Sequence, residues 1–219
     1  MAVDAVIFDL DGTLLDTEKI STEAFVQVLG PQFTMEHQRR VMGVPLDTWP
    51  LMLIADFQLT MTPTDLAHQV HAAYEEKLPF CTLIPGGLDL VTGLTAKGIK
   101  VALATSSTAS AVSIKRMAHP ALFDAFDVIV CGDDPAVKRG KTNPDIFLTA
   151  AARLGIQDMS QCVVVEDSVS GVQGGKAAGM QVVAVPDTRF FDADDIAKRF
   201  SHADVILSSL HDFQKAVFP

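Results

Sequence analysis

Short runs of apolar and β-branched residues recur along the chain, with longer helical stretches between them. Such runs are typical of strands in a parallel sheet, because helices cover both faces and leave no polar side. The alternation of the two patterns predicts an α/β fold. The predicted strands are Ala5–Phe8, Val101–Ala104, Val128–Cys131, Val163–Val165 and Val182–Val185, followed by a short strand at 205–210 and a helix at 212–217.

The segment at residues 17–81 has a different pattern. Apolar residues recur there at helical spacing, and no run is typical of a strand. The sequence Pro85-Gly86-Gly87 then marks a turn and a return to the α/β pattern. We therefore predict a Rossmann-like parallel-sheet core at residues 1–16 and 82–219, with a small α-helical cap domain at 17–81 inserted after the first strand.

Composition and charge limit the classes of partner. A formal charge of -10 provides no basic field that would attract nucleic acid or an anionic membrane. No stretch approaches the roughly 20 apolar residues of a membrane helix, and the first residues lack a secretory signal. The three cysteines are far apart, so we expect buried thiols and no disulfide framework. We expect a cytoplasmic protein, monomeric or weakly dimeric, that binds a small molecule.

Polar residues follow four of the predicted strands directly. In open α/β sheets, ligands bind at the carboxyl ends of the strands, so these residues are expected to meet in one crevice. They are Asp9, Thr105, Gly132 with Asp133, and Glu166 with Asp167.

The first strand continues into Asp9-Leu10-Asp11-Gly12-Thr13. Two carboxylates spaced i, i+2 at a strand end can point the same way, and Gly12 lets the backbone turn sharply beside them. If a divalent cation holds the pair together, one carboxylate can attack phosphorus while the other transfers protons. The alternative is that Asp-Gly forms an ordinary turn with Asp as a helix cap.

Three other elements can likewise be interpreted as parts of a catalytic site or as ordinary structural features. Thr105-Ser106-Ser107 offers a hydroxyl and backbone amides to an anion at a strand-to-helix junction, or it only caps the helix. Lys141 precedes a helix that we expect to be capped near Asn143, and it either neutralises phosphate and Asp9 or is a solvated surface residue. The adjacent acids Glu166-Asp167 follow an apolar strand, which is unfavourable without a metal or a partner charge.

Taken in order, these elements resemble the motifs of the haloacid dehalogenase superfamily, in its branch of small phosphatases and phosphomutases with a helical cap. The resemblance covers nearly the whole chain. It rests mainly on Asp9-Leu10-Asp11-Gly12-Thr13-Leu14-Leu15-Asp16-Thr17-Glu18 and Glu166-Asp167-Ser168. One departure is Gly140-Lys141-Thr142-Asn143-Pro144, which lacks the first Pro of the family's Gly-Lys-Pro-x-Pro motif.

The resemblance implies a Mg²⁺-dependent phosphatase that works through an aspartyl-phosphate. It also implies a role for each matched residue. Asp9 would be the nucleophile and a metal ligand, and Asp11 the general acid/base, with a carbonyl that also reaches Mg²⁺. Asp167 would be the remaining protein ligand, supported by Glu166. Thr105, the Ser106 amide and Lys141 would hold the phosphoryl group. Glu18 and Gly43 of the helical cap would contact the substrate.

Several functions remain open at this level. β-Phosphoglucomutases carry a cap Arg shortly after a Gly-Val pair, but Gly43-Val44-Pro45-Leu46 has an apolar residue there, which favours hydrolysis. Haloacid dehalogenases lack the second Asp of the first motif, so Asp11 favours phosphate chemistry. A catalytically silent Mg²⁺-binding module is a third alternative. The later half resembles phosphatases of pseudouridine 5'-phosphate, glycerol 3-phosphate and sugar phosphates, so we expect a nucleoside, sugar or polyol phosphate as substrate.

Overall fold

The computed structural model describes residues 3–44 and 47–218. The chain divides into two compact units, Met1–Asp16 with Thr82–Pro219, and Thr17–Cys81. These limits coincide with those of the core and cap domains predicted from the sequence. That each unit folds as an independent domain stays a prediction.

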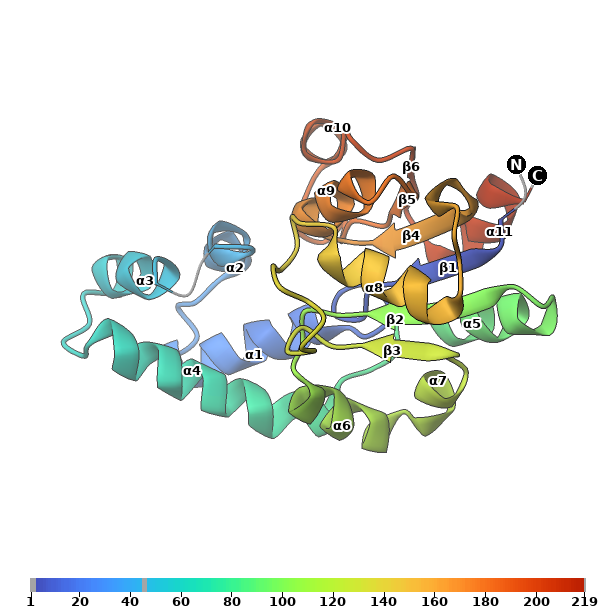
Figure 1. The fold of residues 1–219 in the computed structure, drawn as a ribbon. Helices are drawn as coiled ribbons and strands as arrows, with labels where there is room; N and C mark the ends of the chain where they lie inside the picture. The colour runs from blue at the N-terminus through green and yellow to red at the C-terminus, as the bar shows by residue number, and fades with distance from the viewer. Residues whose placement is uncertain (1–2, 45–46, 219) are drawn as a thin grey trace. The chain divides into compact units, whose positions relative to one another are not determined.

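The first unit contains a six-stranded, wholly parallel sheet with the order β3-β2-β1-β4-β5-β6 (Figure 1). This confirms the predicted α/β class. The predicted strand at 205–210 is wrong in length, because it pairs only at two residues and then turns into a 3-10 helix at Leu210–Asp212. The strands are β1 (Ala5–Phe8), β2 (Lys100–Ala104), β3 (Val128–Val130), β4 (Cys162–Glu166), β5 (Gln181–Ala184) and β6 (Val205–Ile206).

Helices cover both faces of this sheet. On one face, α8 packs against β1, β2 and β3, and α9 packs against β4 and β5 (Figure 1). Helix α5 packs against β2. The helices of this unit are α5 (Gly87–Ala96), α6 (Ala109–Ala118), α7 (Pro120–Asp124), α8 (Asp145–Leu154), α9 (Val169–Ala177), α10 (Ala193–Arg199) and α11 (Phe213–Val217), with a 3-10 turn at Met159–Gln161.

Neighbouring residues of β1 enter different parts of the core. Ile7 belongs to a cluster with Phe147 of α8 and Val164 of β4. Phe8 instead meets Phe126 and Phe213, with ring centroids 6.1 and 6.5 Å apart. Because successive side chains of a strand point to opposite faces, β1 needs apolar residues at every position, and its four residues are all buried.

The second unit is helical in its described part, as predicted. Helices α1 and α4 pack along each other, and both contribute to a hydrophobic cluster of aromatic and aliphatic side chains. Trp49 contacts Phe25 edge-on, with ring centroids 5.2 Å apart, so it packs in this core. The helices are α1 (Thr17–Leu29), α2 (Met35–Val41), α3 (Trp49–Phe57) and α4 (Pro63–Lys77), followed by a 3-10 turn at Leu78–Phe80.

Two composition-based expectations can be compared with the structure. Cys81 and Cys162 are buried, whereas Cys131 is only partly buried. None of the helices in the described ranges combines the length and apolar character needed to cross a membrane.

Replacing the fully buried Leu66 of α4 by Ala tests whether the helical unit is a separate domain. Removing a core Leu side chain costs roughly 2–5 kcal/mol. If the units are independent, amide hydrogen exchange in Leu66→Ala will accelerate within 17–81 and stay unchanged in the sheet. Equal acceleration in both units would show that they unfold as one domain.

Candidate active site

The register of the sheet brings several predicted site residues to one edge. Phe8 of β1 is level with Leu103 of β2 and Val165 of β4. The residues that follow these three positions therefore emerge at the same carboxyl edge, as expected from the sequence. Hydrogen bonds continue past the strand end, since the Asp9 N–H donates to the Val165 carbonyl at 2.9 Å.

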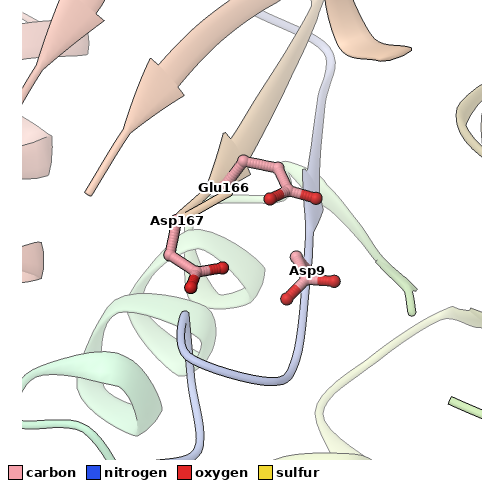
Figure 2. A group of neighbouring side chains, drawn as sticks. All are labelled: Asp9, Glu166 and Asp167. Atoms are coloured by element: carbon pink, nitrogen blue, oxygen red, sulfur yellow. The ribbon is translucent and has the colours of Figure 1, made fainter. Parts of the chain in front are cut away.

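Three acidic side chains converge at this edge. Carboxylate oxygens of Asp9, Glu166 and Asp167 all lie within 4.8 Å of one another, with Asp9 at the end of β1 and the other two at the end of β4 (Figure 2). Asp9 and Glu166 are buried, so their mutual repulsion is weakly screened by water. Thr13 Oγ1 donates to Asp167 Oδ1 at 3.1 Å. A cluster of carboxylate oxygens is the donor set that hard divalent cations prefer, and these residues fit such an ion.

Two glycines bring the backbone close to these acids. Gly12 has a φ of +87°, and a Cβ there would lie 2.1 Å from Asp167 Oδ2. A Cβ at Gly171 would lie 1.8 Å from Glu166 Oε1. These two glycines therefore allow the backbone to approach the carboxylates closely.

Lys141 supplies a positive charge to the cluster. Its Nζ donates to Asp9 Oδ1, and to Glu166 Oε1 at 2.7 Å. Burial raises the pKa of Asp9 to about 7, although the Lys141 charge opposes this shift. Burial by itself would lower the pKa of Lys141, but the Asp9 and Glu166 charges outweigh it and the pKa is raised. Lys141 is thus a buried ammonium in contact with two carboxylates.

The helix after Lys141 begins close to the predicted position. It starts at Asp145, with Pro144 in the N-cap position. Asn143, expected as the cap, instead donates its side-chain amide to the Gly140 carbonyl at 3.1 Å. This bond closes the turn that carries Lys141.

Asp11 has a different set of partners from Asp9. Its Oδ2 accepts a hydrogen bond from Ser107 Oγ at 2.7 Å and one from Thr105 Oγ1 at 3.3 Å, and its Oδ1 accepts from Lys115 Nζ. Ser107 was predicted only as part of the Thr105-Ser106-Ser107 element, and Lys115 was not predicted as a site residue. From the sequence, a Lys in the middle of a helix is expected to be solvated. The only weak indication that Lys115 is buried was its i, i+3 spacing from the apolar Val112, which places both on one face of the helix.

Thr105 and Ser106 lie in the loop between β2 and α6. Thr105 Oγ1 accepts from the Ser107 N–H at 3.0 Å, and the Thr105 N–H donates to the Val130 carbonyl at 3.1 Å. A Cβ at Gly132 would lie 2.3 Å from the Ser106 carbonyl oxygen, so the loops after β2 and β3 touch. This loop approaches Asp11 through the Thr105 and Ser107 hydroxyls.

The remaining predicted residues, Glu18 and Gly43, lie in the helical unit. Both line a cavity of about 420 Å³ within that unit. Gln38 Nε2 donates to Glu18 Oε2 at 3.0 Å, while Gln38 Oε1 is buried without a hydrogen-bond partner among the described residues. Pro45 and Leu46, used above to argue against a mutase, lie outside the described residues.

Comparison with known proteins defines the family. The model of the haloacid dehalogenase-like hydrolase family matches residues 6–185, which include the sheet edge and its acidic cluster. The chain therefore belongs to this family, and the resemblance inferred from the motifs is confirmed.

Individual relatives narrow the class of activity. The chain is 38% identical to a Drosophila melanogaster protein named "Probable pseudouridine-5'-phosphatase", over 97% of this chain and 92% of that protein. It is 34% identical to (DL)-glycerol-3-phosphatase 2 of Arabidopsis thaliana, over 97% and 90% of the two chains. A crystal structure from Thermotoga maritima, described as a "putative beta-phosphoglucomutase", superimposes with a TM-score of 0.80 at 29% identity over 98% of each chain. The protein is a phosphatase of the haloacid dehalogenase type.

Thermal unfolding with and without Mg²⁺ tests the acidic cluster as a metal site. Because an ion that binds only the folded state stabilises it, Mg²⁺ at about 100 times its Kd should add roughly 2.7 kcal/mol to the wild type. We expect Asp167→Ala to lose most of the resulting rise in Tm. Asp194→Ala, which removes an exposed acid of α10, is the matched control and should keep it. An undiminished rise in Asp167→Ala would remove Asp167 from the metal site.

Proposed function

We propose that this protein hydrolyses a small phosphomonoester with Mg²⁺, by way of a phosphoryl group carried on Asp9. The observation that supports this most directly is the buried Asp9 carboxylate, held by Lys141 beside Glu166 and Asp167. A carboxylate is a competent nucleophile toward phosphorus when cations offset the charge of the phosphoryl oxygens.

Each charged side chain has a task in this proposal. Asp9 and Asp167 bind Mg²⁺ with the Asp11 carbonyl, and Glu166 supports them. When bound, the ion neutralises phosphoryl charge. Lys141 holds one oxygen of Asp9 and offsets charge on the transferring group. Thr105 and the Ser106 amide bind the phosphoryl oxygens.

The reaction then takes two displacements. An Asp9 oxygen forms a bond to phosphorus as the bond from phosphorus to the ester oxygen breaks, and Asp11 gives that oxygen a proton. Asp11 next takes a proton from water, whose oxygen bonds to phosphorus as the Asp9–phosphorus bond breaks. The products are an alcohol and inorganic phosphate, and both carboxylates return to their starting state.

The helical unit supplies substrate selection in this proposal. A cavity of about 420 Å³ is large enough for a sugar or nucleoside, and Glu18 and Gly43 line it. Relatives named for pseudouridine phosphate and glycerol phosphate favour a nucleoside, sugar or polyol phosphate, with pseudouridine 5'-phosphate as the first to assay. A cytoplasmic location and a monomeric or weakly dimeric state stay predictions.

Substituting the nucleophile tests the covalent step. In Asp9→Asn the amide cannot attack phosphorus, so kcat toward p-nitrophenyl phosphate should fall by at least about 10⁴-fold. Asp194→Asn is the control and should keep full activity. Turnover near the wild-type rate in Asp9→Asn would exclude Asp9 as nucleophile, and sustained wild-type turnover in EDTA would exclude a metal requirement. A silent Mg²⁺-binding module predicts no turnover even in the wild type.

An assay with β-glucose 1-phosphate distinguishes a phosphatase from a mutase. The mutase alternative is tested because the similar Thermotoga maritima structure is described as a putative β-phosphoglucomutase. A mutase must hold two phosphate groups and return the phosphoryl group to the sugar. We expect inorganic phosphate and glucose, measured by chromatography with a phosphate assay. Accumulation of glucose 6-phosphate would identify a mutase instead.

A further inference from the structure

We infer that Lys115 is a positioning residue for proton transfer by Asp11, an inference that rests on the proposed function. Lys115 lies on α6, away from every motif that identified the family, and its side chain is only 1% exposed. A buried ammonium is strongly unfavourable unless hydrogen-bond acceptors and an opposite charge surround it. The structure supplies both, as Asp11 Oδ1 and as Ser107 Oγ at 2.9 Å.

The two aspartates of the first motif have separate lysines. Lys141 bonds Asp9 and Glu166, whereas Lys115 bonds Asp11 and Ser107. Lys141 therefore forms ion pairs with the proposed nucleophile and its acidic neighbour. Lys115 forms an ion pair with the carboxylate that we propose as general acid and base.

The contacts of Lys115 fix the orientation of Asp11. Lys115 holds Oδ1, and it also holds the Ser107 hydroxyl, which donates to Oδ2 at 2.7 Å. With both oxygens bound from the side of α6, rotation of the Asp11 carboxyl is restricted. Proton transfer requires a narrow range of distance and angle, so loss of this restraint should slow the step that uses it.

This role predicts an effect that depends on the leaving group. The alkoxide that leaves glycerol 3-phosphate is strongly basic and needs a proton as it departs. The nitrophenolate of p-nitrophenyl phosphate is a stable anion and does not. Loss of a residue that acts through Asp11 should therefore lower kcat/KM strongly for the alkyl ester and only slightly for the aryl ester. A general loss of structure would lower kcat/KM for both esters.

The test compares kcat/KM for the two esters in wild type and Lys115→Met, because kcat/KM reports the steps up to release of the alcohol. We expect a loss of about 10-fold or more for glycerol 3-phosphate and less than about 3-fold for p-nitrophenyl phosphate. The control, Lys176→Met, breaks an ion pair with Asp204 in which the charged atoms are 2.7 Å apart. Neither residue belongs to the site, so this substitution should change neither value. Equal losses for both esters, or no loss, would overturn the inference.

A second variant keeps the test decisive if Lys115→Met does not fold, as judged by its thermal transition. Ser107→Ala removes the shorter of the two hydroxyl contacts to Asp11 Oδ2 and leaves Lys115 in place, and we expect the same selective loss for the alkyl ester. An unselective or absent effect in Ser107→Ala would overturn the inference in that case. If the wild type does not hydrolyse glycerol 3-phosphate, pseudouridine 5'-phosphate serves as the alkyl ester in the same comparison. A wild type inactive toward all three esters would instead overturn the proposed function, and this inference with it.

Discussion

The site depends on how its buried negative charge is balanced. Asp9, Glu166 and Asp167 place carboxylate oxygens within 4.8 Å of one another, and one ammonium, that of Lys141, bonds two of the three. A buried cluster with excess negative charge is unstable unless a cation or protons reduce it. Burial, and to a smaller extent the charges of Glu166 and Asp11, accordingly raises the pKa of Asp9. A divalent cation would relieve the same pressure and leave Asp9 ionised.

The fold creates this balance by aligning strand ends. The parallel register of β1, β2 and β4 brings acids, hydroxyls and loops from distant parts of the sequence to one edge. Gly12 then lets the backbone approach Asp167 where any side chain would collide. The helical unit is a separate insert in the chain, so the substrate selection that we propose for it could vary without changing the sheet that holds the charges.

The sequence predicted the parts of the molecule that depend on local patterns. Apolar strands and the acids that follow them are visible because burial on both faces and a polar strand end leave clear signals. Lys115 left no such signal, since only the tertiary structure shows that its helix turns this residue toward Asp11. The length of β6 was misjudged because pairing partners decide where a strand ends. The cap of α8 is Pro144, one residue after Asn143, since the Asn143 side chain bonds to Gly140 in the preceding turn.

Mass spectrometry of rapidly acid-quenched enzyme most directly tests the claim that Asp9 bonds to phosphorus. The enzyme would be mixed with Mg²⁺ and excess phosphomonoester, quenched during turnover and digested for peptide mapping. We expect phosphate on the peptide that contains Asp9, assigned to Asp9 by fragmentation and absent in Asp9→Asn. Phosphate on another residue would contradict the claim that Asp9 bonds to phosphorus. So would the absence of phosphate from the enzyme under conditions where hydrolysis of the intermediate limits turnover.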